Sequence, residues 1–190
     1  MHEIRIVKSS KKYATSYCDT MDSVSREGKF LSVNKGYPLS EIVRFIKICR
    51  ECGYPQYFLI NEEDKAVGWC DIVRRSNQPD DVGYLGIGIL KQYRNMGWGT
   101  KLIDAAVQEA IKCGFNEIRL EVRASNENAI HTYKKYGFVC ISYDVDGVTT
   151  DGVSEDVWTM SYMARNVESN EFTRDKFFDI FPKIKFKFEH

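Results

Sequence analysis

The 190-residue sequence has no excess of charge of either sign and no long hydrophobic run. Lysine and arginine together number 27, and so do aspartate and glutamate, which gives a formal net charge of zero. Nucleic-acid-binding proteins usually carry a basic excess, so no nucleic acid partner is expected. No segment approaches the roughly 18 apolar residues of a membrane-spanning helix, and residues 1–12 are charged, unlike a signal peptide. These absences predict a soluble, cytoplasmic protein with no membrane partner.

The sequence also lacks a second group of closely spaced metal ligands. Cys49 and Cys52 form one C-x-x-C pair, but no other cysteine pair and no histidine cluster completes a zinc site. The remaining cysteines are mostly spread through apolar patterns, which is typical of reduced core residues. We therefore expect structural thiols and no bound metal.

Apolar residues follow two different periods along the chain, which predicts interleaved strands and helices. Strands are predicted at residues 2–8, 56–60, 66–73, 83–90, 117–123, 138–145 and 153–163. Helices are predicted at 13–26, 40–52 and 126–136, with one more that runs from the glycines near residue 98 to Gly114. Ser40 is the expected N-cap of the second helix. This order predicts an α/β protein with a mixed sheet covered by helices.

The segment RNMGWGTKLIDAA (94–106) places two glycines where this helix must begin. Glycine costs about 0.5–1 kcal/mol in regular structure relative to alanine, so the corner is expected to need bare backbone. The unpaired N–H groups and partial positive charge of a helix N-terminus suit a phosphate. Gly97 and Gly99 would let the backbone approach the anion, and Arg94 would add a charge-assisted contact. The spacing of the glycines matches neither a triphosphate-binding loop nor a dinucleotide-binding fingerprint. The alternative to a phosphate site is therefore a glycine-rich turn without a ligand.

Two segments around this corner resemble the signatures of the GNAT superfamily of N-acetyltransferases. GIGILKQYRNMGWGTKL (86–102) is similar to its acetyl-coenzyme-A signature, because RNMGWG fits the pattern (Q/R)-x-x-G-x-(G/A). LEVRASNENAIHTYKKYGF (120–138) resembles its second signature, a strand followed by N-x-x-A-x-x-x-Y and a terminal G-F. This second segment is especially similar to enzymes that acetylate the N-terminus of a ribosomal protein.

The resemblance covers about residues 4–163, strongly over 83–138, and implies an α/β (α+β) fold of GNAT type. Such a fold has a central mixed, mostly antiparallel twisted sheet with splayed strands, flanked by helices. The strand containing Ile87 and Ile89 should separate from the neighbouring strand 117–123. Backbone groups freed in this way would bind the pantetheine arm of acetyl-CoA.

The resemblance also implies which residues hold acetyl-CoA as the co-substrate. The backbone amides of residues 95–100 would cradle the pyrophosphate, and the Asn126 side chain would hold the pantetheine. Asparagine before a helical run is also an ordinary N-cap, and both roles can hold for Asn126. The full implied set is Ile87, Ile89, Arg94, Asn95, Met96, Gly97, Trp98, Gly99, Thr100 and Asn126.

Acetyl transfer to an amine needs a base for the ammonium proton and an acid for the departing thiolate. Tyr133 matches the family's tyrosine acid, and its place on the helix predicts an inward side chain. Glu121, twelve residues earlier, aligns with the glutamate proposed as base in the ribosomal-protein enzymes. Its alternative role is an ion pair with Arg119 or Arg123 on the sheet surface. Asp71 is the reserve candidate for the base.

The resulting prediction is an acetyl-CoA-dependent N-acetyltransferase in which an amine attacks directly within a ternary complex. The loop GKFLSVNKGYPL (28–39) is expected to line the acceptor pocket, because it carries apolar side chains that a solvated loop would not need. Phe30, Tyr37 and Asp71 are the candidate substrate-binding residues. The acceptor is predicted to be a small primary amine, such as an amino-acid-like molecule. The alternatives are a protein N-terminus, or a coenzyme-A-binding sensor without catalysis.

Residues 1–164 are predicted to form the acetyltransferase domain, and residues 165–190 a C-terminal extension. In the extension, lysines alternate with Ile184, Phe186 and Phe188, which is the period of a strand with one apolar face. Such a strand would either add to the edge of its own sheet or contact a partner subunit. Both a monomer and a homodimer are therefore open.

Overall fold

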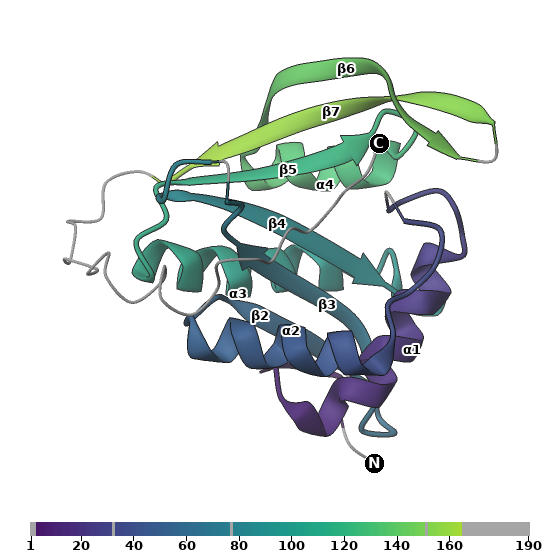
Figure 1. Ribbon diagram of the computed structural model, residues 1–190, viewed down its shortest axis with the longest axis vertical. Helices are drawn as coiled ribbons and strands as arrows, with labels where there is room; N and C mark the ends of the chain where they lie inside the picture. Colours follow the sequence, from purple (N-terminus) through teal and green to yellow (C-terminus); the bar gives the residue numbers. More distant parts are fainter. Residues whose placement is uncertain (1–2, 32, 77, 151, 165–190) are drawn as a thin grey trace.

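The computed structural model describes residues 3–31, 33–76, 78–150 and 152–164, and the predicted strand near 184–188 lies outside them. The described chain forms a seven-stranded sheet with a pair of helices on each face (Figure 1). The strands are β1 (Arg5–Lys8), β2 (Gln56–Ile60), β3 (Ala66–Val73), β4 (Val82–Ile89), β5 (Glu117–Arg123), β6 (Val139–Thr150) and β7 (Val153–Met163). The helices are α1 (Ala14–Ser25), α2 (Leu39–Glu51), α3 (Trp98–Lys112) and α4 (Glu127–Tyr136), with short 3-10 helices η1 (Lys11–Tyr13) and η2 (Lys91–Tyr93).

The sheet is mixed and mostly antiparallel, as predicted. Within the described residues its strand order is β1-β2-β3-β4-β5-β7-β6. Neighbouring strands pair antiparallel except β4 and β5, which run parallel. Helix α3 crosses between these two parallel strands, so the chain passes from β4 to β5 over one face of the sheet.

Each face of the sheet buries its own core. Helices α3 and α4 cover one face, and the core there includes Ile72, Leu85, Leu102, Ile103, Ala106, Ile118, Leu120 and Tyr133. Helices α1 and α2 cover the opposite face, and the core there includes Tyr17, Val24, Ile42, Ile46, Phe58 and Trp69. In Figure 1, α1 and α2 lie in front of the sheet and α3 and α4 behind it.

The start of α2 differs from the prediction. The helix begins at Leu39, and Pro38 rather than Ser40 occupies the N-cap position. The Pro38 carbonyl accepts hydrogen bonds from the Glu41 and Ile42 amides at 3.0 and 3.1 Å, so it closes the first helical turn. Ser40 therefore lies inside that turn, and its assignment as the cap was wrong.

Two predicted strands also change in length. The first strand begins at Arg5 rather than at residue 2. The sixth continues past residue 145 to Thr150, because its hairpin pairing with β7 reaches from Val139 to Thr150 through two register shifts. A bulged hairpin interrupts strict alternation, which hides the second half of such a strand from a periodicity analysis.

The strands β4 and β5 separate halfway along their length, as predicted. They pair only at Val82–Glu117, Gly83–Ile118 and Tyr84–Arg119 among the described residues. Beyond Tyr84, β4 remains paired with β3 and β5 remains paired with β7, so the two strands diverge while each keeps its outer neighbour. The result is a gap between β4 and β5, visible in Figure 1, that opens toward the end of β4.

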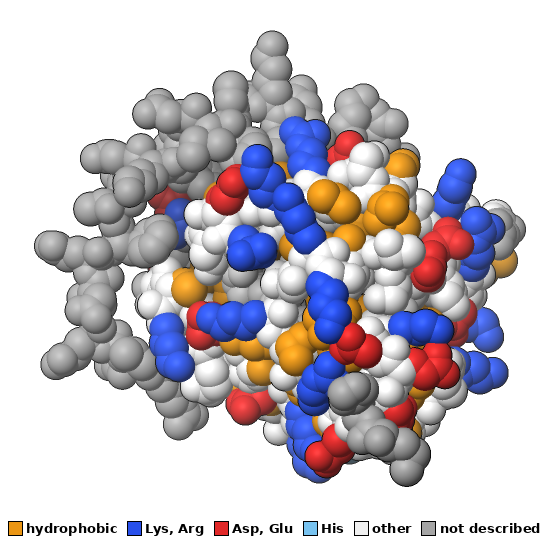
Figure 2. Space-filling model, turned by 90° about the horizontal axis from the view of Figure 1, so that it is seen from below, with side chains coloured by type: hydrophobic (Ala, Val, Ile, Leu, Met, Phe, Trp, Pro, Cys, Tyr) orange, Lys and Arg blue, Asp and Glu red, His pale blue; other side chains and the backbone are white. Residues whose placement is uncertain are grey.

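The surface carries charges of both signs. In Figure 2 basic and acidic side chains are interspersed, with apolar patches between them. Exposed apolar side chains also follow β6, at Val139, Ile141, Tyr143 and Val145. In the part of the chain that the structure describes, no helix has the length and apolar character required to cross a membrane.

Candidate active site

The gap leads from the free edge of β4 to the beginning of α3. Gly86 and Ile87 are half-buried in the half of β4 that is paired with β3 but no longer with β5. The predicted backbone sites at Ile87 and Ile89 therefore lie along this edge. The Ile89 carbonyl already accepts a hydrogen bond from Arg94 Nε at 2.7 Å.

The N-terminus of α3 is uncapped and exposed. Gly97 is its N-cap residue with φ of +81°, so no side chain bonds the first-turn amides, and no acidic residue lies in that turn. Asn95 also has a positive φ of 60°. The side chains of Asn95, Met96 and Thr100 are exposed. Free amides at an exposed helix N-terminus form the arrangement that binds anions.

The packing of the corner itself leaves room at both glycines. Apart from its chain neighbours, a Cβ atom built on Gly97 would meet no heavy atom of the described residues within 4 Å, and among the same residues one on Gly99 would meet only Ile89 Cδ1, at 3.9 Å. Gly97 still needs its left-handed conformation, whereas Gly99 is an ordinary residue of α3. Internal packing therefore does not require glycine at residue 99.

Gly99→Ala is expected to raise the free energy of unfolding by about 0.5–1 kcal/mol, because alanine is favoured in helices and its methyl group has room. Gly114→Ala is the matched control at the other end of α3. A Cβ atom there also meets nothing within 4 Å among the described residues beyond its chain neighbours, but the φ of +88° strains alanine and should destabilise the protein. Urea denaturation measures both effects, and destabilisation by Gly99→Ala would contradict the helical start at Trp98.

Arg94 binds groups of its own chain. Its NH1 donates to Glu27 Oε2 at 2.8 Å, and its NH2 donates to Glu27 Oε1 in a two-pronged pair. The guanidinium carbon lies 4.6 Å from the centroid of the Phe30 ring. A phosphate contact, as predicted for Arg94, would use the N–H groups that these bonds leave available.

Tyr133 points into the core, as predicted from its place on α4. Its side chain is 7% exposed and packs against Phe138, with ring centroids 5.9 Å apart. Burial raises the pKa of the Tyr133 phenol above its ordinary value, and the Cys70 thiol adds to this shift. Because Cys70 is the sheet partner of Ile87, Tyr133 lies on the α3–α4 side of the gap.

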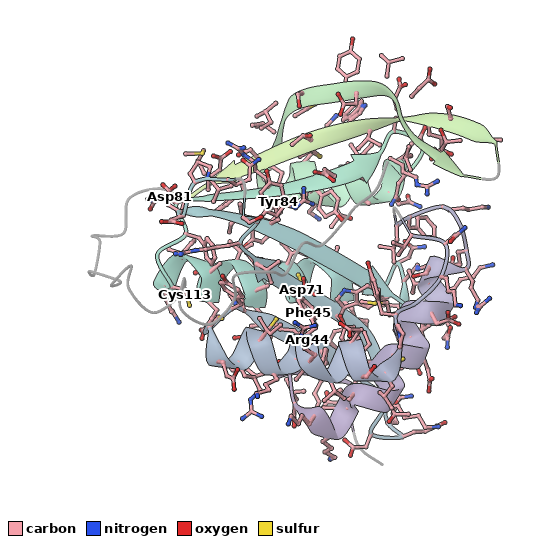
Figure 3. All side chains as sticks on the ribbon, in the orientation of Figure 1. Arg44, Phe45, Asp71, Asp81, Tyr84 and Cys113 are labelled. Atoms are coloured by element: carbon pink, nitrogen blue, oxygen red, sulfur yellow. The ribbon has the colours of Figure 1, made fainter. Side chains whose placement is uncertain are left out.

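Asp71, a residue of β3, lies on the opposite face of the sheet from Tyr133. Its carboxylate Oδ1 would be 3.2 Å from a Cβ atom on Gly86, its register partner in β4, so it lies over the β4 backbone where that strand has separated from β5. The side chain, labelled in Figure 3, is 7% exposed and faces the layer of Tyr17 on α1 and Cys49 on α2. Burial raises the pKa of Asp71 to about 7. Within the described residues, no ion pair or hydrogen bond reaches this carboxylate.

Glu121 occupies the predicted face of β5 with a different partner. Its side chain is 46% exposed and accepts a hydrogen bond from Arg75 NH1 at 2.6 Å. Arg75 also stacks over Tyr84, with its guanidinium carbon 3.8 Å from the ring centroid. Arg119 binds Glu117 instead, and Arg123 binds the loop described next. The alternative considered for Glu121, an ion pair with Arg119 or Arg123, was therefore wrong in its partner, since the arginine comes from the segment after β3.

The loop expected to line the acceptor pocket is attached to β5. Arg123, 5% exposed, donates to the Gly28 carbonyl at 2.9 Å and to the Leu31 carbonyl at 2.7 Å. Phe30 is half-buried against Arg94, and Tyr37 is 40% exposed. Sequence reasoning missed this role of Arg123, because a charged residue at the end of a strand carries no signal of burial.

The cysteines are buried or partly covered, apart from Cys140, and none forms a disulfide in the described chain. Burial raises the pKa of the Cys49 thiol. It also raises the pKa of the Cys52 thiol, which is less deeply buried. Raised thiol pKa values lower the fraction of reactive thiolate. Among the described residues, no group of three or more His, Cys, Asp or Glu side chains is arranged to hold a metal ion.

Residues 26–138 match the profile of a protein family described as "Acetyltransferase (GNAT) family". The chain belongs to the GNAT acetyltransferase family. The matched segment runs from the end of α1 to Phe138, so it includes the loop at 28–39, both strands of the gap, the α3 corner and Tyr133.

Named relatives of this GNAT protein match it over part of their length. An N-alpha-acetyltransferase from Sulfurisphaera tokodaii is 48% identical over 56 residues, which are 28% of this chain and 33% of that protein. N-alpha-acetyltransferase 50 from Danio rerio is 36% identical over 110 residues, 55% of this chain and 63% of that protein. The chain thus spans about a third and somewhat under two thirds of these two relatives.

The fold agrees with a solved GNAT structure. The acetyltransferase of GNAT family from Streptococcus pneumoniae superimposes with a TM-score of 0.78 at 25% identity, covering 85% of this chain and 100% of that one. The mixed sheet with splayed central strands is therefore the GNAT fold that the sequence motifs predict.

Proposed function

We propose that this protein is an acetyl-CoA-dependent N-acetyltransferase that transfers the acetyl group directly to a primary amine in a ternary complex. The observation that carries the proposal is the gap between β4 and β5, which leads to an uncapped helix N-terminus. A free strand edge binds an extended amide-containing arm in the manner of an added strand. The helix N-terminus binds phosphates, so the gap has the order of groups that pantetheine and pyrophosphate require.

The residues present fit coenzyme A. Gly97 leaves open space above the first-turn amides, where an anion could approach the backbone. Asn126 caps α4 by accepting the Ala129 amide on Oδ1 at 3.3 Å, which leaves its NH2 group for a pantetheine carbonyl. When bound, acetyl-CoA supplies an activated acetyl thioester. The chain's own residues then have to orient it and to move two protons.

We assign those two proton transfers to Tyr133 and Asp71, which lie on opposite faces of the sheet. The raised pKa of Tyr133 keeps its phenol protonated at neutral pH, so it can donate to a departing thiolate. A base works best when its pKa lies near the operating pH, and Asp71 has a pKa of about 7. We favour Asp71 over Glu121, because the Glu121 side chain is 46% exposed and its carboxylate is already bound by Arg75 at 2.6 Å.

If Asp71 is the base, kcat/KM is expected to rise with pH through about 7, as this carboxyl loses its proton. Asp71→Asn should remove that step and lower kcat/KM by roughly 10²- to 10⁴-fold at pH 7.5. Its stability should change in the opposite direction. The raised pKa means that the folded state holds a proton that the unfolded state releases, so wild-type stability falls between about pH 4 and 7. The variant should therefore be the more stable protein at pH 8.

The matched control for this pH profile is Glu121→Gln. Both proteins face the same titration of the amine substrate, so only the difference between their profiles reports on the base. A normal profile in Asp71→Asn together with a shifted one in Glu121→Gln would assign the base to Glu121. Urea denaturation at pH 5 and pH 8 separates the stability effect from the kinetic one.

Two acceptor classes follow from a primary amine. The sequence analysis predicts a small amine as acceptor. The names of the two N-alpha-acetyltransferases described above favour instead the α-amine of a polypeptide. An acceptor screen with acetyl-CoA, read as release of free thiol, should compare pooled small amines with N-terminal peptides. Turnover with one pool assigns the class. Coenzyme A binding without turnover in either pool would favour a non-catalytic sensor.

A further inference from the structure

Glu27 joins the acceptor loop to the α3 corner. It lies two residues after the end of α1, directly before the loop at 28–39. Both of its carboxylate oxygens bind the Arg94 guanidinium, and the two side chains are only 27% and 24% exposed. Phe30 of the same loop stacks on Arg94. The loop therefore touches the corner through one arginine of the GNAT signature.

The other attachments of this loop lead elsewhere. Arg123 ties Gly28 and Leu31 to β5. Asp22 of α1 accepts the Gly36 amide on Oδ1 at 3.0 Å. These bonds hold the loop to the sheet and to α1, but they do not reach the first turn of α3. Loss of the Glu27 carboxylate would thus remove the charged contact between the loop and the corner and leave the Phe30 ring on Arg94, without releasing the loop from the rest of the domain.

The same bonds occupy the arginine that the corner offers to an anion. A guanidinium has five N–H donors, and Glu27 and the Ile89 carbonyl engage three of them. The Glu27 carboxylate also places a negative charge directly against Arg94, which lies four residues before the first residue of α3. Both effects oppose the binding of a phosphate there.

We propose that Glu27 is a positioning residue that holds the acceptor loop against the α3 corner through Arg94, and that this hold lowers the affinity of the corner for coenzyme A. The inference rests on the proposed function, because it places the pyrophosphate at that corner. Removing a residue with a merely structural role would weaken the binding of both substrates. Removing the Glu27 carboxylate should instead strengthen the binding of coenzyme A and weaken that of the acceptor.

Glu27→Gln is the test, with coenzyme A and the acceptor found in the screen as probes. By calorimetry the dissociation constant for coenzyme A should fall roughly three- to tenfold, since a partly exposed charge is removed near the phosphates. The KM for the acceptor should rise, and kcat should stay within about twofold, because the loop loses a positioning contact and no reacting group. Hydrogen exchange of the free protein should show faster exchange of the loop amides.

Two further variants sharpen the result. Glu27→Asp keeps the charge but shortens the side chain, so coenzyme A affinity should stay near the wild-type value while the acceptor KM rises. Asp19→Asn removes a carboxylate from the exposed surface of α1 and should leave the coenzyme A affinity and the acceptor KM unchanged. Weaker binding of both substrates by Glu27→Gln, or behaviour equal to that of Asp19→Asn, would overturn the inference and leave the proposed function intact. Failure of the wild-type protein to bind coenzyme A would overturn both.

Discussion

Replacing Gly97 by valine is expected to abolish coenzyme A binding in a protein that still folds. Valine would place a branched side chain in the space above the first-turn amides, where the pyrophosphate is proposed to lie. Among the described residues, no atom beyond the chain neighbours lies within 4 Å of its Cβ position. The left-handed backbone at φ +81° adds a strain of roughly 1–2 kcal/mol. That strain lowers the melting temperature but removes no core contact.

Ligand-induced stabilisation measures this loss directly. A ligand at 100 times its dissociation constant stabilises a protein by about 2.7 kcal/mol, so the wild-type melting temperature should rise with added coenzyme A. Gly97→Val should show no such rise at the same concentrations. Gly114→Val is the matched control, because it strains an equally open glycine with φ of +88° at the far end of the same helix. Unchanged coenzyme A affinity in a folded Gly97→Val protein would remove the phosphate site from this corner.

Most of the fold could be predicted from local patterns. The strands at 56–60, 66–73, 117–123 and 153–163 agree with the structure to the residue, because each has a clear apolar period bounded by turn residues. The second half of β6 could not be predicted, since its place depends on bulged pairing with β7. The cap of α2 was missed for a related reason. Serine is usually preferred at N-cap positions, but here Pro38 takes that position, because its ring fixes the backbone φ one residue before the helix.

The candidate site could be predicted where it depends on motif spacing. The signature segments correctly indicated the separation of β4 and β5, and the inward side chain of Tyr133. Partners that come from distant parts of the chain were not predictable. Glu27 and Arg94 are 67 positions apart, and Arg75 and Glu121 are 46 apart. Only the folded sheet brings such pairs together, so local pattern analysis has no access to them.

Tyr133→Phe is expected to lower kcat by roughly 10²- to 10⁴-fold while acetyl-CoA binding persists, if Tyr133 is the acid that protonates the departing thiolate. The substitution keeps the ring and its packing against Phe138. Since no hydrogen bond within the described residues depends on the Tyr133 hydroxyl, folding should be little affected. The raised pKa of this phenol has a further consequence. The acid should stay protonated across the neutral range, so its loss should lower the rate without adding a step to the pH profile near 7.

Tyr136→Phe is the matched control, because it removes a hydroxyl from the same helix. The Tyr136 hydroxyl donates at 3.1 Å to Asp104, an exposed residue of α3. Its loss should leave kcat within about twofold of the wild-type value. The comparison should be made by single-turnover kinetics, because slow product release would hide a loss in the chemical step. A near-normal single-turnover rate in folded Tyr133→Phe would mean that water or another side chain protonates the thiolate, and Tyr133 would then be a packing residue of the α3–α4 core.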